Sequence, residues 1–66
     1  MEKVHVYLLT KNALYYECSH CGLKHSHGNE KETILGNWTT RRNSHCLKKK
    51  QEIILEVNNF TIRKVF

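Results

Sequence analysis

Hydrophobic and polar residues alternate near the start of the chain, which is the pattern of a β-strand with one buried face. Val4, Val6 and Leu8 fall on one side of this segment. Residues 11–12 suit a turn, and residues 13–17 predict a second strand that is rich in tyrosine. Two strands of about five residues joined by a short turn predict a β-hairpin.

A second hairpin is predicted in the C-terminal part of the chain. Residues 33–40 favour a strand by residue type. Apolar residues alternate again over 52–57, and the asparagine pair at 58–59 suits a two-residue turn before a last strand at 60–66. Residues 47–56 also suit one short helix, because lysine, glutamine, glutamate and leucine are good helix formers.

Size and cysteine content point to a metal. The chain has 66 residues, 39% of them apolar, and domains this small usually need a disulfide, a metal or a partner for net stability. Three cysteines cannot all be paired in a closed disulfide framework. The first residues alternate charged and apolar side chains without a signal-peptide core, so we expect a cytoplasmic protein whose thiols stay reduced.

Cys18 and Cys21 form a C-x-x-C-G element with Gly22, which is typical of a zinc knuckle. The glycine allows the left-handed backbone that such tight turns need. A redox pair is the alternative, but thioredoxin-type motifs begin a helix in a βαβ unit that this chain is too short to hold. A structural zinc site takes four ligands, and Cys46 is the only other thiol and hence the predicted third. A small buried core residue is the other interpretation of Cys46.

The fourth ligand is expected to be a histidine. His27 and His25 are two residues apart and therefore share a face on extended backbone. His45 adjoins Cys46, so on a strand the two would point to opposite faces. We rank His27 first, His25 second and His45 third. The sequence thus predicts a Zn²⁺ site made by Cys18, Cys21, His27 and Cys46.

The positive charge is concentrated in the C-terminal part. The net charge is +5, and residues 41–66 hold seven lysines and arginines against two glutamates. Such asymmetry favours an anionic partner, most often DNA or RNA. The predicted phosphate contacts flank Cys46 on both sides and are Arg41, Arg42, Lys48, Lys49 and Lys50. A solvated basic surface is the alternative.

Three aromatic residues could stack on unpaired bases: Tyr15, Tyr16 and Trp38. Packing within the hairpins or the core explains the same residues. For Trp38, which is the only tryptophan, we expect a core position.

The middle of the chain resembles a group of small zinc-ribbon-like proteins of phages, plasmids and bacteria. The pattern C-x-x-C-G-x-x-H-x-H-G runs from Cys18 to Gly28, and R-x-x-H-C follows from Arg42 to Cys46. The resemblance implies a zinc-ribbon-like fold and an origin in a mobile genetic element. It implies no particular activity.

Enzyme templates are missing from the sequence. There is no H-x-E of a zinc deaminase, no H-E-x-x-H and no P-loop, and a chain of this length has little room for a sheltered active site. We therefore expect residues 1–66 to form a single non-enzymatic domain, two β-hairpins around a zinc knuckle, that binds nucleic acid. The alternative is a protein-interaction module, an accessory subunit or inhibitor of a host or element-encoded enzyme, that uses exposed hairpin edges.

Overall fold

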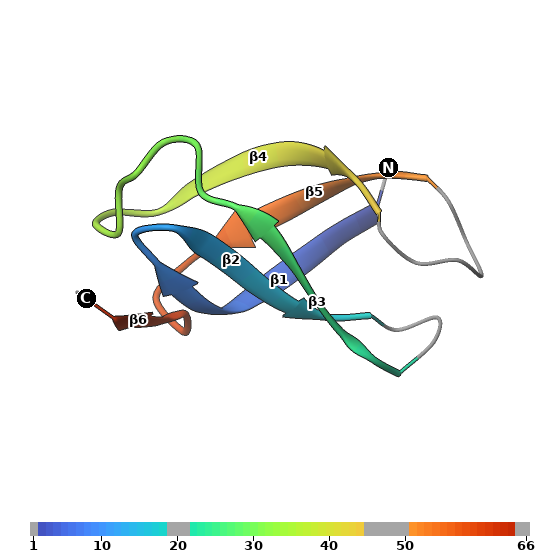
Figure 1. Cartoon of the computed structure of the whole chain (residues 1–66), viewed down its shortest axis with the longest axis horizontal. Coiled ribbons are helices and arrows are strands. Elements are labelled where there is room, and N and C mark those ends of the chain that lie inside the picture. The colour runs from blue at the N-terminus through green and yellow to red at the C-terminus, as the bar shows by residue number, and fades with distance from the viewer. Residues whose placement is uncertain (1, 19–21, 45–50, 65–66) are drawn as a thin grey trace.

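The computed structural model describes residues 2–18, 22–44 and 51–64, and most of these lie in six β-strands (Figure 1). The strands are β1 (Glu2–Thr10), β2 (Ala13–Glu17), β3 (Lys24–Gly28), β4 (Trp38–Asn43), β5 (Glu52–Val57) and β6 (Ile62–Lys64). The prediction of a small mainly-β domain is confirmed. The alternative of a short helix is wrong for residues 52–56, which belong to β5, while residues 47–50 lie outside the described part. No helix within the described residues could span a membrane.

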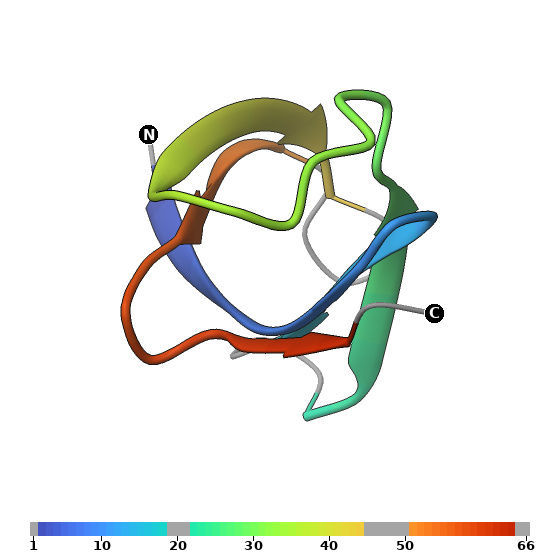
Figure 2. The same ribbon diagram turned by 90° about the vertical axis from the view of Figure 1, so that its left-hand side faces the viewer.

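The strands form one sheet in the order β3-β2-β1-β5-β4, and β6 pairs with β1 outside this series. The two halves of β1 pair with different strands. Its first half pairs in parallel with β5, and its second half pairs antiparallel with β2 and parallel with β6. Seen end on, the sheet curls round on itself, so that β3 and β4 approach each other as the two ends of an incomplete ring (Figure 2).

The core fills the inside of the curled sheet. Its buried members come from β1, β2, β5 and the residue after β2: Val6, Leu9, Leu14, Tyr16, Cys18, Ile53, Leu55 and Val57. In β5 the alternation of buried and less buried residues is regular, as expected of a strand with one core-facing side.

A bulge in β1 changes which residues face the core. The pairing with β2 shifts register between Val6 and Leu8. An extra residue inverts the alternation beyond it, because side chains on a strand alternate with period two. Val6 and Leu9 are therefore both fully buried, whereas Leu8 is half-buried. The prediction that Val4, Val6 and Leu8 share the core face is wrong at Leu8.

The first hairpin is confirmed, and it continues into a strand that the sequence pattern missed. Thr10 Oγ1 accepts hydrogen bonds from the backbone N–H groups of Asn12 (3.2 Å) and Ala13 (2.9 Å), which closes the β1–β2 turn. Strand β3 then pairs along the whole of β2. Its sequence, Lys-His-Ser-His-Gly, has no apolar residue that would mark it as a strand.

The predicted hairpin of 52–57 with 60–66 is wrong. Both β5 and β6 run parallel to β1, so the chain resumes its direction after residues 58–61 instead of reversing. The hydroxyl of Thr61 donates to the carbonyl of Val6 (2.7 Å), and this buried bond fixes the excursion against β1. The second hairpin is formed by β4 and β5. The strand predicted over 33–40 begins only at Trp38, after Gly36 with its φ of 79°.

Candidate metal centre and outer surface

Cys18 lies at the end of β2, where the chain turns back toward β3. Its N–H donates to the carbonyl of Leu23 (2.8 Å), and its own carbonyl accepts from the N–H of Gly22 (2.9 Å). Gly22 has a φ of 74°, the left-handed conformation expected for the glycine after the second cysteine. The side chain of Cys18 is buried as part of the core cluster. Cys21 and His20 lie outside the described residues.

His25 and His27 share the inner face of β3, as their spacing predicts. Tyr16 stands directly opposite His25, and Leu14 stands opposite His27. Because opposite residues in an antiparallel pair project to the same side, both imidazoles lie on the side of the buried Tyr16 and Leu14. The Tyr16 ring contacts both, with centroid separations of 5.6 Å to His25 and 5.8 Å to His27.

The two histidines differ in their distance from Cys18. Cys18 pairs with Leu23, so His25 is two residues further along β3 and His27 is four. At about 3.3 Å per residue these offsets correspond to about 7 Å and about 13 Å along the strand. A cysteine and an imidazole can meet at one ion across the first offset, but the second exceeds the reach of their side chains.

The connection that carries Cys46 joins β4 to β5. Strands β2 and β4 both run opposite to the parallel pair β1 and β5, so they end on the same side of the sheet. Figure 1 shows β2 and β4 ending on the right, where β3 and β5 begin. The base of the β4–β5 connection is closed by a bond from Ser44 N to Gln51 O (2.8 Å). His45 and Cys46 lie between these residues, outside the described part.

Tyr16, two residues before Cys18, carries a buried polar atom. The hydroxyl of Tyr16 is buried and has no hydrogen-bond partner among the described residues. Tyr16 precedes Cys18 on the same inner face of β2. A site with thiolate ligands next to this hydroxyl would supply the acceptor that a buried donor requires. The described residues alone contain no cluster of three potential metal ligands, and two of the three cysteines fall outside them.

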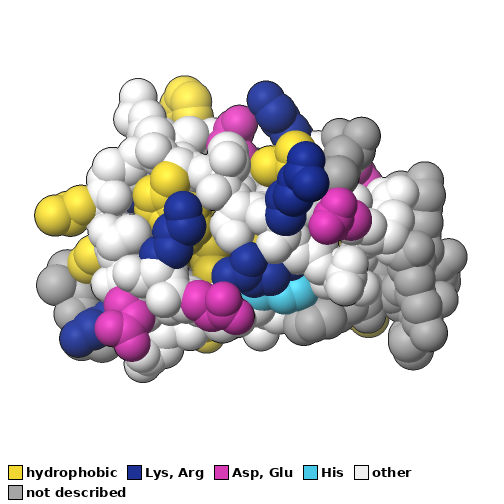
Figure 3. All heavy atoms as spheres, turned by 90° about the horizontal axis from the view of Figure 1, so that it is seen from above, with side chains coloured by type: hydrophobic (Ala, Val, Ile, Leu, Met, Phe, Trp, Pro, Cys, Tyr) yellow, Lys and Arg dark blue, Asp and Glu magenta, His cyan; other side chains and the backbone are white. Residues whose placement is uncertain are grey.

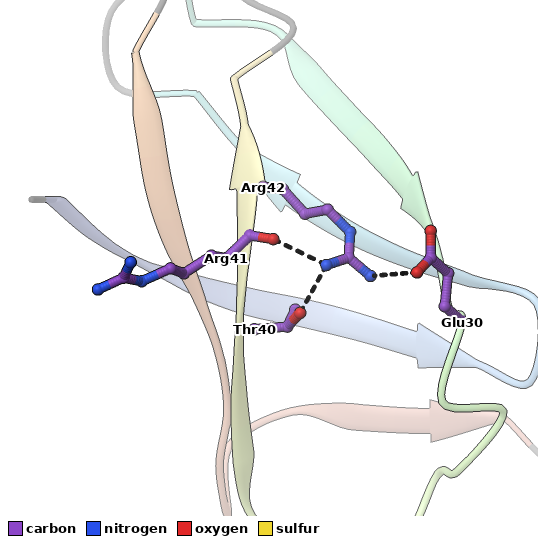
Figure 4. A network of polar contacts seen from close by, with 4 residues as sticks. All are labelled: Glu30, Thr40, Arg41 and Arg42. Atoms are coloured by element: carbon purple, nitrogen blue, oxygen red, sulfur yellow. Dashed lines mark hydrogen bonds and ion pairs between the residues drawn. The ribbon is translucent and has the colours of Figure 1, made fainter.

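Strand alternation separates the two predicted arginines. Arg42 shares the inner side of β4 with Thr40, and its guanidinium donates to Thr40 Oγ1 (2.6 Å) and to the carbonyl of Arg41 (2.7 Å). It also lies 3.7 Å from the Glu30 carboxylate, beyond the end of β3 (Figure 4). Arg42 thereby links β4 to the connection after β3. Arg41 is exposed and points away from this network (Figure 4).

The outer face of the sheet carries other basic residues. Lys3 and Arg41 flank Ile54 on the neighbouring strands β1, β5 and β4. On the face seen in Figure 3, acidic side chains are interspersed among the basic ones, so the described part of that face is mixed in sign. The predicted contacts Lys48, Lys49 and Lys50 belong to the β4–β5 connection and lie outside the described residues.

Only one of the three predicted stacking residues faces outward. Tyr16 is buried at 1% exposure, and Trp38 packs against the core with the ammonium of Lys31 5.2 Å from its ring centroid. Tyr15 is half-buried opposite Leu8 on the outer side. The sequence reasoning missed Tyr7, whose outward position next to the β1 bulge follows from its alternation with Val6.

Comparisons with known proteins give no relative. No family model matches the chain, and no match was found among curated proteins or solved structures.

Proposed function

We propose that this chain is a zinc-stabilised β domain that binds nucleic acid. The observation that carries the proposal is the direction of the strands: the connection after β2, which contains Cys18 and Cys21, and the connection after β4, which contains Cys46, leave the same end of the sheet. Among the described strands, β3 and β4 are not paired with each other. One ion bound by cysteines of both connections would therefore link the β2–β3 hairpin to the β4–β5 hairpin.

The proposed ligands are Cys18, Cys21, Cys46 and one histidine. The sequence ranks His27 first, but the strand register favours His25, because His27 is about 13 Å from Cys18 along the ribbon. His27 is instead suited to the core, where it stacks on Tyr16 with an interplanar angle of 12°. His45 is the remaining alternative.

Zinc would supply stability that the core lacks. Structural zinc in small domains contributes an apparent binding free energy of about 10–16 kcal/mol, which becomes folding free energy when the site exists only in the folded state. Among the described residues eight side chains form the buried core, and domains of this size usually need a metal, a disulfide or a partner in addition. The ion would also hold the β4–β5 connection, with Lys48–Lys50, at a defined end of the sheet.

The basic residues support an anionic polymer as the partner. Arg41 and Lys3 are exposed on the outer face, and Lys48–Lys50 belong to the β4–β5 connection that also carries the proposed ligand Cys46. Lysine and arginine contacts to phosphates release condensed counterions, so the affinity should fall steeply with salt. Arg42, which is engaged with Glu30, is the weakest of the predicted contacts.

The test is fluorescence anisotropy of the zinc-loaded protein with labelled oligonucleotides over a salt series. We expect binding at low salt, with the logarithm of the association constant falling linearly with the logarithm of the salt concentration. The slope should be smaller when Lys48–Lys50 are replaced by alanine. Lys31→Ala is the matched control, because Lys31 lies over Trp38 in the connection before β4. Absence of binding at low salt would exclude the nucleic-acid function.

A protein-interaction module is the second candidate, and one specific observation favours it. Leu35, Phe60 and Ile62 are 77%, 83% and 60% exposed. The guanidinium of Arg63 donates to the carbonyls of Gly36 (2.8 Å) and Asn58 (3.1 Å), which draws the segments bearing Leu35 and Phe60 together. An exposed apolar group of this kind is typical of a protein-binding surface. If the protein binds no oligonucleotide at any salt concentration, the protein-interaction module is the remaining candidate.

A further inference from the structure

A hollow of about 330 Å³ opens beside β1, where its pairing with β2 stops. It is lined by Val4, His5, Tyr7 and Glu17. The ladder between β1 and β2 ends at the Val6–Tyr16 pair, and Glu17 is the first residue of β2 beyond it. The bulge next to Tyr7 and the end of the ladder together create a space that side chains of the described residues leave open.

The lining combines one aromatic ring with polar groups. Tyr7 is half-buried and offers an apolar ring face, while His5 and Glu17 are exposed. The ammonium of Lys24 lies 5.4 Å from the Tyr7 ring centroid. Since Lys24 stands on β3 and Tyr7 on β1, the lysine reaches across the outer side of β2. A positive charge therefore lies over the ring of Tyr7, one of the residues that line the hollow.

A nucleobase matches this arrangement. It is flat, and its faces stack on aromatic rings in single-strand-binding proteins. The exocyclic amino groups of cytosine and adenine donate hydrogen bonds, which a glutamate carboxylate accepts. Thymine has an acceptor oxygen at the corresponding position. Lys24 would meet the phosphate next to the bound base. Bases stacked within a duplex cannot enter a hollow of this kind.

We propose that the hollow holds one unstacked nucleobase of a single-stranded nucleic acid, stacked on Tyr7 and with its amino group directed to Glu17. This inference rests on the proposed nucleic-acid function. The inference adds two preferences to that function: single strands over duplexes, and cytosine or adenine over thymine.

The experiment compares single-stranded dC, dA and dT oligomers with a duplex of equal length, at one low salt concentration, using zinc-loaded protein. The variant Tyr7→Leu keeps the apolar bulk and removes the aromatic face. We expect it to weaken single-strand binding about 5- to 50-fold and to leave duplex binding unchanged. Glu17→Gln should reduce the preference for dC over dT. Leu35→Ala is the control, because Leu35 is exposed in the connection between β3 and β4 at the opposite end of the sheet.

Circular dichroism of each variant establishes that the fold is retained, and Tyr7→Trp, which restores an aromatic face, should recover single-strand binding. Equal affinity for single strands and duplex, together with an unchanged Tyr7→Leu variant, would overturn the inference and leave nucleic-acid binding intact. If no oligonucleotide binds at low salt, both the inference and the proposed function fail.

Discussion

His25 lies directly opposite Tyr16 on the β2–β3 ribbon, and their ring centroids are 5.6 Å apart. The same tyrosine ring stacks on His27, which lies two residues further from Cys18 along β3. Tyr16 thus orients two imidazoles on the inner face of β3, of which only the nearer can share an ion with the cysteine at the end of β2. For the proposed zinc centre, this relationship favours His25 as the ligand and assigns His27 to the core.

The two histidines form a matched pair for substitution. We expect His25→Ala to lower the zinc affinity strongly, because it removes one of four ligands. His27→Ala should retain zinc but lose about 1–2 kcal/mol of unfolding free energy, since a buried ring that stacks on Tyr16 is removed. Competition with a chromophoric chelator measures the first effect, and urea unfolding measures the second. Loss of zinc in His27→Ala with full binding in His25→Ala would contradict the register argument.

Removal of zinc should unfold the domain. A chelator in excess, or the substitution Cys18→Ser, is expected to abolish the near-ultraviolet circular dichroism of Trp38, which packs against the core. The reason is that the free energy of zinc binding, about 10–16 kcal/mol in small domains, exceeds what this core can provide. Re-addition of zinc should restore the signal for the wild-type chain. A native-like spectrum after complete removal of metal would show that the fold does not depend on zinc.

Arg41 and Arg42 should behave oppositely although they are neighbours in sequence. Arg42→Ala removes hydrogen bonds to Thr40 and to the backbone, and we expect a stability loss of about 0.5–1.5 kcal/mol. Most of this loss comes from the hydrogen bonds, because the Glu30 partner of the ion pair is 83% exposed.

Arg41→Ala should leave the stability unchanged and reduce the salt slope of oligonucleotide binding by about one. Urea unfolding and a salt series on both variants check the pair. Equal effects of the two substitutions on binding would show that strand alternation does not separate their roles.

Thr61 tests the unusual path of the chain between β5 and β6. Thr61→Val keeps the shape and removes the hydroxyl that donates to Val6 O and accepts from the N–H of Asn58 (3.1 Å). We expect a loss of about 1–3 kcal/mol for the backbone groups left without this partner. Thr39→Val, at an exposed position of β4, is the control and should be nearly neutral. A neutral Thr61→Val would mean that this hydrogen bond does not stabilise the parallel pairing of β6 with β1.

The elements with a clear apolar alternation could be predicted from the sequence, and those defined by a partner strand could not. Strand β5 has Ile53, Leu55 and Val57 on one side, which its structure retains. Strand β3 has no apolar pattern, because its inner positions are taken by histidines. The turn residues before β6 are equally compatible with a hairpin and with an excursion, so the sequence holds no local sign that β6 joins β1.

The candidate site shows the same division. The spacing of Cys18, Cys21 and Gly22 predicts a tight turn after a strand, and the structure has the turn and the positive φ of Gly22. The choice between His25 and His27 needs the register of β3 on β2, which depends on the whole ribbon. Tyr15 and Tyr16 are adjacent and chemically identical. Only the pairing of the strands shows that Tyr15 lies on the outer face and Tyr16 in the core.

Zinc K-edge X-ray absorption of the purified protein is the most direct test of the proposed metal centre. We predict one zinc per chain with about three sulfur ligands at about 2.3 Å and one imidazole nitrogen at about 2.0 Å. In His25→Ala the nitrogen contribution should be replaced or the metal lost, while in His27→Ala the spectrum should be unchanged. A protein that binds no zinc under reducing conditions, or a metal shell without sulfur, would contradict the proposed centre.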